Sequence, residues 1–289
     1  MFKRILICTD LGDGINRLVN FIPQLAEAGV QQATFLHSVP LDDDGEIPRE
    51  DQAAMQRAKA LLAPATATPV PGIEVQVEVD SGGAKASILA MVQKYDAELV
   101  LLGSPIRSLL TQKMFGSTAG ALAEQLKRPL MILRPPVVST YMEAELRLRC
   151  KALFSSFLIP YDGSDSANHL LAELKQRIRD NPASSLQSCV LVWVIEPGSR
   201  FPQEDAEEKA LGSLAQVQAE LEALGLAVKT QVRRGSLMEQ VMAAATEEDI
   251  SAIAISDRKT NRFLDWSVPS FGAQVLRQSW HPVLFFPPA

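Results

Sequence analysis

The feature that most constrains this chain is a repeat, because landmarks of its first half return in the same order about 152 residues later. Asp10 follows an apolar segment near the N-terminus, and Asp162 follows a similar segment 152 residues further on. Four other pairs are each separated by 153 residues: Gly82 and Gly235, Gly103 and Ser256, Ser117 and Ser270, and Pro129 and Pro282. Such a constant spacing indicates an internal duplication. We therefore predict two copies of one fold.

Length and composition agree with two domains. The 289 residues are 47% hydrophobic, which is enough for two ordinary cores. Pro135 and Pro136 interrupt the pattern of the first half, and residues 137–152 follow as a charged connector with some helical character. We predict a first domain at residues 1–136, this connector, and a second domain at residues 153–289.

Each half alternates short strands with segments of helical periodicity. In the first half the predicted strands are residues 4–9, 33–39, 73–79, 99–102 and 129–133. Helical spacing recurs between them, including one helix that begins at Ile15 and ends at Gly29. This alternation is typical of an α/β fold with a mostly parallel sheet and right-handed crossovers.

Two glycines of the first half suggest an anion site. Gly103 ends a buried strand, and Gly116, Ser117 and Thr118 open the next helix. A glycine lets a ligand approach the backbone closely, and the first turn of a helix leaves N–H groups unpaired at the positive end of its dipole. The pairing favours an anion such as phosphate. A plain strand–helix crossover capped by Ser117 remains the alternative.

Charge and apolar patterning exclude several classes of protein. The net charge is −6 without a long basic run, which argues against nucleic acid as a partner. The apolar start reaches Asp10 too soon for a signal peptide, and no run of 18 apolar residues follows, so we predict a cytoplasmic protein without a membrane partner. Cys8, Cys150 and Cys189 lack the spacing of a disulfide framework or a zinc site, and we expect no metal.

The ordered motifs resemble the universal stress protein family in its tandem two-domain form. The matching segments are Asp162-Gly163-Ser164, Leu101-Leu102-Gly103-Ser104, Gly116-Ser117, Arg128-Pro129-Leu130-Met131-Ile132 and His281-Pro282-Val283-Leu284. The resemblance implies a five-stranded parallel α/β sandwich of the nucleotide-binding, adenine nucleotide alpha hydrolase-like type in each half. It also implies that the last strands of the two halves pair, as an internal pseudo-dimer, and it leaves a homodimer open.

Nucleotide-binding members of this family share a pattern of Gly, two residues, Gly, nine residues, Gly and Ser or Thr. The first half keeps this spacing, but Ile106 replaces the second glycine and restricts the backbone there. The resemblance implies a site for ATP or another adenine nucleotide, with or without Mg²⁺. Its residues in this sequence are Asp10, Val39, Gly103, Ser104, Gly116, Ser117 and Thr118.

The second half departs further from this pattern. Ser256, Lys259 and Pro269 stand at the three glycine positions, and only Ser270 remains. Proline removes an N–H donor at the start of the helix, and Ser256 adds a side chain where close approach is needed. We therefore predict a degenerate second half that binds no nucleotide. The second half also has a basic loop, with Arg258, Lys259 and Arg262, so binding of another anion there stays open.

No catalytic constellation is evident. None of the three histidines has a spaced metal or triad partner, and no Gly-x-Gly-x-x-Gly fingerprint follows either first strand. A hydrolase or dehydrogenase is thus disfavoured, and we expect no enzyme beyond a very slow ATPase. The predicted function is a stress-response or signalling protein with an unknown protein partner and one adenine-nucleotide site in the first half. The alternative is an interaction or scaffold protein that binds no nucleotide.

Overall fold

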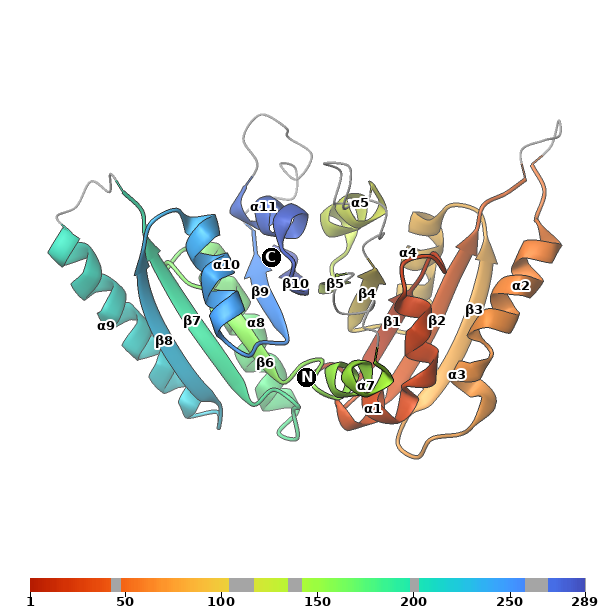
Figure 1. Cartoon of the computed structure of the whole chain (residues 1–289), viewed down its shortest axis with the longest axis horizontal. Helices are drawn as coiled ribbons and strands as arrows, with labels where there is room; N and C mark the ends of the chain where they lie inside the picture. The colour runs from red at the N-terminus through yellow and green to blue at the C-terminus, as the bar shows by residue number, and fades with distance from the viewer. Residues whose placement is uncertain (43–47, 104–116, 135–141, 198–202, 258–269, 289) are drawn as a thin grey trace. The chain divides into compact units, whose positions relative to one another are not determined.

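The computed structural model describes residues 1–42, 48–103, 117–134, 142–197, 203–257 and 270–288. The chain divides into two compact units, Phe2–Lys151 and Ala152–Ala289. Each unit is built from five parallel strands with helices on both faces (Figure 1). The predicted α/β fold in two tandem copies is therefore confirmed. Among the described helices, none has the length and apolarity that crossing a membrane requires.

The first half orders its strands β3-β2-β1-β4-β5. The strands are β1 (Arg4–Cys8), β2 (Gln32–Val39), β3 (Glu74–Ser81), β4 (Leu99–Gly103) and β5 (Leu130–Leu133). Its helices are η1 (Ile15–Asn20), α1 (Ile22–Glu27), α2 (Gln52–Leu62), α3 (Pro64–Ala67), α4 (Ala84–Lys94), α5 (Ser117–Gln125) and α7 (Glu143–Lys151). Because β2 and β4 flank β1 in parallel register, the chain reverses its direction of winding between β1 and β4. Ligands of open α/β sheets bind at the carboxyl ends of the strands at such a point.

The second half repeats this order as β8-β7-β6-β9-β10. The strands are β6 (Ser156–Pro160), β7 (Ser188–Ile195), β8 (Ala227–Arg234), β9 (Ala252–Ser256) and β10 (Val283–Phe286). The helices are α8 (Asp165–Asp180), α9 (Gln203–Glu222), α10 (Leu237–Glu247) and α11 (Phe271–Gln278). Consecutive residues of the central strand, such as Phe157, Leu158 and Ile159, are fully buried. Consecutive burial requires cover on both faces of the sheet, which the crossover helices supply.

The helix predicted from Ile15 to Gly29 is two shorter elements. η1 ends at Asn20, and α1 starts at Ile22 with a proline in its first turn. Pro23 cannot donate a backbone hydrogen bond, and its ring would clash with the carbonyl of Val19 in a continuous helix. The apolar spacing was correct in marking the buried face, since Ile15, Leu18 and Leu25 are all buried, but the proline breaks the helix.

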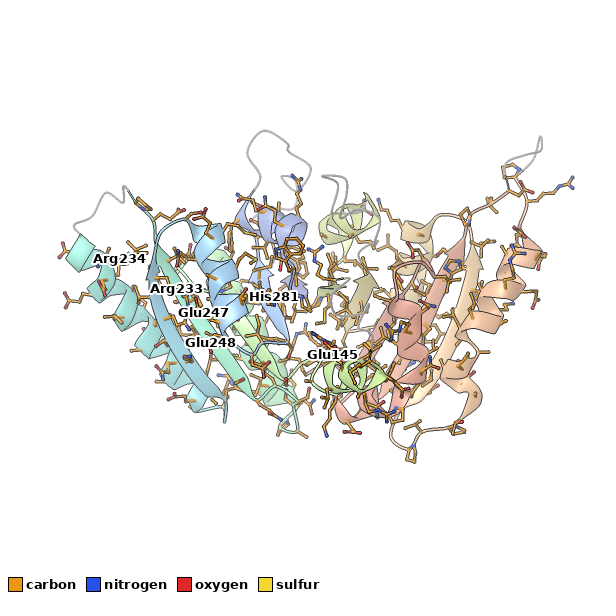
Figure 2. The ribbon with its side chains drawn as sticks, viewed as in Figure 1. Glu145, Arg233, Arg234, Glu247, Glu248 and His281 are labelled. Carbon is orange, nitrogen blue, oxygen red and sulfur yellow. The ribbon has the colours of Figure 1, made fainter. Side chains whose placement is uncertain are left out.

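Helix α7 packs against α1 and belongs to the first unit. Leu146 and Cys150 are its buried residues. On its exposed side Arg149 donates to Glu145, one turn earlier, at 2.6 Å. Figure 2 labels Glu145 on this helix. Such pairs between residues four apart support a helix by a few tenths of a kcal/mol, about 0.3–0.5 in exposed positions.

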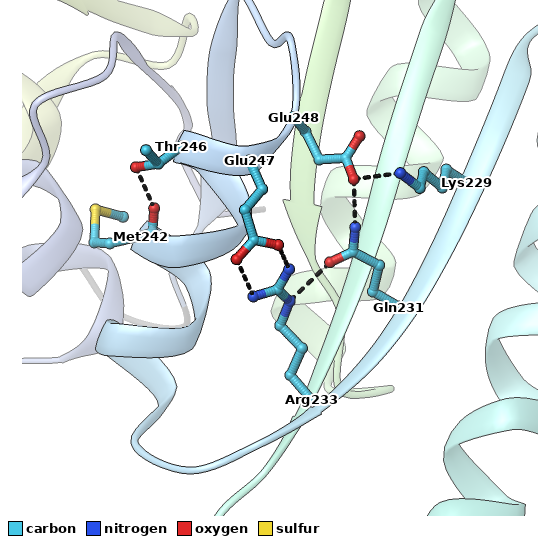
Figure 3. Close-up of polar contacts among 7 residues, drawn as sticks. All are labelled: Lys229, Gln231, Arg233, Met242, Thr246, Glu247 and Glu248. Carbon is cyan, nitrogen blue, oxygen red and sulfur yellow. Dashed lines mark hydrogen bonds and ion pairs between the residues drawn. The ribbon is translucent and has the colours of Figure 1, made fainter.

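A polar network joins the edge strand β8 to α10 (Figure 3). Glu248 accepts from Lys229 at 2.5 Å and from Gln231 at 2.6 Å, and Gln231 in turn accepts from Arg233 at 2.7 Å. Arg233 also pairs with Glu247, which holds the pKa of that carboxyl below its usual range. These contacts fix the C-terminal end of α10 against the sheet, and the opposite end of the helix reaches the cleft described below.

Candidate functional site

The structure brings three of the sequence-predicted site residues to one edge of the first sheet. Asp10 follows β1, Val39 ends β2 and Gly103 ends β4, and these strands are parallel neighbours. Ser117 and Thr118 begin α5. Ser104, Gly116 and the substituted position Ile106 lie outside the described residues. The predicted site thus falls at the carboxyl ends of the strands, where this fold class binds ligands.

Asp10 is exposed and serves the turn that follows β1. Its Oδ1 atom accepts a hydrogen bond from the backbone N–H of Gly12 at 2.8 Å. Asp162 has the same role in the second half, where it accepts from the N–H of Ser164 at 2.9 Å. Aspartate is favoured in such turns because its short side chain can accept from the backbone two residues on.

The dominant group beside Gly103 is Asp13. Only 3% of Asp13 is exposed. Its carboxylate accepts from the hydroxyl of Thr9 at 2.8 Å and from the backbone N–H of Ile15 at 3.0 Å. Burial raises the pKa of this carboxyl, against the hydrogen bond from Thr9, which lowers it. A buried carboxyl group is thus held in the turn between β1 and η1.

Asp13 fills the space that the missing side chain of Gly103 leaves open. A Cβ atom placed on Gly103 would lie 2.4 Å from Oδ2 of Asp13 and 2.7 Å from its Cβ, closer than real atoms approach. Gly103 is therefore required by a contact within the protein. A phosphate could reach this backbone only if the side chain of Asp13 moved.

This contact between Asp13 and Gly103 is not among the predictions made from the sequence. Residues 13 and 103 are far apart in the sequence, so no local pattern pairs them. A second aspartate in a turn that already has Asp10 was the available signal, since one carboxylate is enough to cap the turn.

The buried state of Asp13 predicts a specific pH dependence. Because its pKa is raised on folding, the folded state favours the protonated form between about pH 4, where an unfolded aspartate titrates, and the raised value. The wild-type chain should therefore gain stability relative to the Asp13→Asn variant as the pH falls from 7 toward 4. Urea unfolding at a series of pH values measures this difference. A difference that does not change with pH would contradict the assignment.

A cleft with a volume of about 210 Å³ lies at the carboxyl ends of β6, β7 and β9 in the second half. This is the same position in the fold as the site predicted for the first half. The lining residues are Pro160, Tyr161, Asp162, Ser164, Ser166, Ala167, Leu170, Val192, Val194, Glu196, Leu237, Ile255, Ser256, Asp257, Phe271 and Gly272. Asp162 and Ser256 mark this edge in the sequence, but no nucleotide site is predicted there from the sequence.

The cleft combines an apolar wall with carboxylates. Val192, Val194 and Glu196 alternate along β7 and its end, so they project from the same face of the sheet. Leu237, the first residue of α10, adds to the apolar side. The described lining residues include three carboxylates and no lysine, arginine or histidine. Such a lining suits a neutral or cationic ligand with an apolar surface.

Two hydroxyl groups at the cleft, those of Tyr161 and Ser256, differ in their hydrogen bonding. The hydroxyl of Tyr161 donates to Oδ1 of Asn168 at 2.9 Å, and burial raises the pKa of that phenol. Ser256 Oγ is buried and has no hydrogen-bond partner within the part of the chain that the structure describes. Because a buried hydroxyl without a partner is costly, Ser256 is a group that a ligand could satisfy.

Two of the three histidines contact backbone carbonyls, and all three cysteines are buried. His37 Nδ1 lies 2.8 Å from the carbonyl of Thr9, and His169 Nε2 lies 2.9 Å from the carbonyl of Pro287. Burial raises the pKa of Cys150 and of Cys189 to about 12, so neither thiol is ionised near neutral pH. Within the described ranges, no three metal-ligating side chains gather as a metal site would need.

Comparison with known proteins identifies the family. The model of the universal stress protein family matches residues 1–134 and again residues 154–287. The chain is 18% identical to a universal stress protein from Archaeoglobus fulgidus DSM 4304, with a TM-score of 0.68 over 99% of this chain and 98% of that one. It is 14% identical to a putative universal stress protein from Pseudomonas aeruginosa UCBPP-PA14, with a TM-score of 0.62 over 99% and 94% of the two chains.

Because their identity to this chain is low, these two structures support its fold and not a particular activity. No curated protein matches the chain significantly. The two family matches together span most of the sequence and agree with the repeat and with the five strands of each half. This chain belongs to the universal stress protein family, with one copy of the family domain in each half.

Proposed function

We propose that this chain is a non-catalytic ligand-binding protein of a stress response, and that the cleft of the second half is its binding site. The ligand is a nucleoside, with adenosine as the representative, bound without phosphate groups. The observation that carries this proposal is the composition of the cleft, in which apolar side chains and carboxylates together line the carboxyl ends of three strands.

Each part of a nucleoside has a counterpart in this cleft. The side chains of Val192, Val194 and Leu237 offer an apolar surface to the flat face of a base. Asp162 and Glu196 can accept hydrogen bonds from ribose hydroxyls or from an exocyclic amine. Ser256 Oγ, which is buried, would gain a hydrogen-bond partner. The described lining offers no cationic side chain to phosphate groups, and its carboxylates would repel them.

The first half is less suited to phosphate binding than its sequence pattern predicts. The family pattern there predicted ATP or another adenine nucleotide, with or without Mg²⁺, but the carboxylate of Asp13 stands at Gly103. An incoming phosphate would meet a buried carboxyl group that hydrogen bonds from Thr9 and Ile15 already hold in place. We therefore assign the ligand to the second half, and we expect ATP turnover well below ~1 s⁻¹, the low end of typical enzymes.

Calorimetric titration of the full chain with adenosine, AMP and ATP tests this function. Each nucleotide is titrated with and without Mg²⁺. We expect adenosine to bind at least tenfold more tightly than AMP, and ATP to bind no more tightly than AMP, because each added phosphate brings negative charge toward the carboxylates. Tighter binding of ATP than of adenosine, or no heat with adenosine, would contradict the proposal.

Occupancy of the site would then signal through conformation or partner affinity. A ligand shifts an equilibrium only by its different affinity for the two states. The cleft is lined by residues of α8, α10 and α11, so a ligand there contacts several elements at once. The interaction protein without any ligand remains the competing hypothesis, and the same titration distinguishes the two.

A further inference from the structure

Asp257 occupies an unusual position in the cleft. It directly follows β9, and its carboxylate lies against the first turn of α11. A Cβ atom on Gly272, the second residue of that helix, would lie 2.8 Å from Oδ2 of Asp257 and 3.3 Å from its Cβ. Both residues line the cleft. As at Gly103, a glycine makes room for a carboxylate of the protein itself.

The start of a helix is a favourable place for negative charge. Its first N–H groups lack partners within the helix, and the helix dipole is positive there. Ser270 caps α11 by accepting from the N–H of Ala273 at 3.2 Å. The carboxylate of Asp257 is thus the anion that already stands at this end of the helix, and it does so inside the cleft.

We infer that Asp257 determines the charge of the ligand by excluding phosphate groups from this cleft. The inference rests on the proposed function in taking the cleft as the binding site. A ligand phosphate directed at the start of α11 would have to share that space with a carboxylate at close range, and both are negative. Removing this one charge leaves the helix start and the buried Ser256 hydroxyl able to receive a phosphate.

The matching position in the first half supports the choice of residue. Asp257 lies 153 residues after Ser104, the same offset that relates Ser256 to Gly103. The second half therefore carries a carboxylate where the first half carries a small neutral hydroxyl. An Asp257→Ser substitution removes the charge and restores the residue of the other half. Asp257→Asn removes the charge at nearly constant shape, so it keeps the fit against Gly272.

The experiment uses the full chain and three variants, Asp257→Asn, Asp257→Ser and Asp180→Asn. Asp180 ends α8, about 22 Å of helix from the residue that begins it near the cleft. Its substitution therefore controls for net charge alone. Each protein is titrated with inorganic phosphate, AMP and adenosine. We expect both Asp257 variants to bind phosphate at least tenfold more tightly than the wild-type chain, and the ratio of AMP to adenosine affinity to rise at least tenfold. The Asp180 variant should change neither quantity by more than about twofold.

The three ligands distinguish a failure of the inference about Asp257 from a failure of the proposed nucleoside function. If phosphate and AMP bind no more tightly to either Asp257 variant than to the wild-type chain, the inference is wrong, whatever adenosine does. If adenosine binds neither the wild-type chain nor the variants while phosphate affinity rises, the inference holds for the anion and the proposed nucleoside function fails. An equal gain in the Asp180 variant would assign the effect to net charge and overturn the role of Asp257.

Discussion

Replacing Gly103 by alanine is expected to lower the stability of the first half by about 2–4 kcal/mol, since overpacking and broken buried hydrogen bonds each cost about 1–3 kcal/mol. The new Cβ would lie 2.4–2.7 Å from three atoms of Asp13, including its Cβ, so a rotation of the carboxylate alone cannot relieve the contact. Moving Asp13 also breaks its bonds to Thr9 and Ile15.

Hydrogen exchange in the full chain measures this loss where it occurs. All three tryptophans lie in the second half, so their fluorescence does not report on the first. Exchange of peptides from β1 and β4 should accelerate by about 30-fold for a loss of 2 kcal/mol. Gly83→Ala is the matched control, because Gly83 has open space around its Cβ position and an ordinary φ of −78°.

A double variant tests the contact itself. Asp13→Gly removes all three atoms that the alanine at position 103 would meet. The combined Asp13→Gly, Gly103→Ala chain should therefore lose less stability than the sum of the two single losses, by more than about 1 kcal/mol. Strict additivity would show that Asp13 and Gly103 do not contact each other in solution.

Replacing Val194 by tryptophan is expected to weaken adenosine binding by at least tenfold, or about 1.4 kcal/mol. Val194 lines the cleft and is only half-buried, so a larger side chain can extend into the space without overpacking the core. Calorimetric titration with adenosine measures the effect, and circular dichroism confirms that the chain remains folded.

Val232→Trp is the control for this substitution. Val232 is also half-buried, and it pairs in register with Trp193 on the neighbouring strand. Side chains alternate along a strand, so Trp193 and Val194 project from opposite faces of the sheet, and Val232 lies on the face away from the cleft. Its substitution should leave adenosine affinity unchanged. Retained binding in the Val194 variant would place the ligand elsewhere.

The fold could be predicted from the sequence because it depends on repeated local patterns. The constant spacing between landmarks such as Asp10 and Asp162 specifies two copies, and strands alternating with helices specify a parallel sheet. A single residue was enough to defeat one local prediction, since Pro23 divides the predicted helix from Ile15 to Gly29 into η1 and α1.

The sites were harder to predict because they depend on contacts between distant residues. Gly103 was correctly identified as a position of close approach, but its neighbour is Asp13, about 90 residues away in the sequence. Gly272 lies against Asp257 in a similar way, but the sequence did not mark this glycine as a position of close approach. A glycine in a motif indicates that something approaches the backbone. Whether a ligand or a side chain approaches is decided by the tertiary structure.

The most direct test of this account is hydrogen exchange of the full chain with and without adenosine, because it locates the bound ligand. The account predicts slower exchange at the end of β9 and in the first turns of α10 and α11, which line the cleft. It also predicts no change at the ends of β1 and β4. Protection at β1 and β4 with none at β9 would place the ligand in the first half and contradict the central claim.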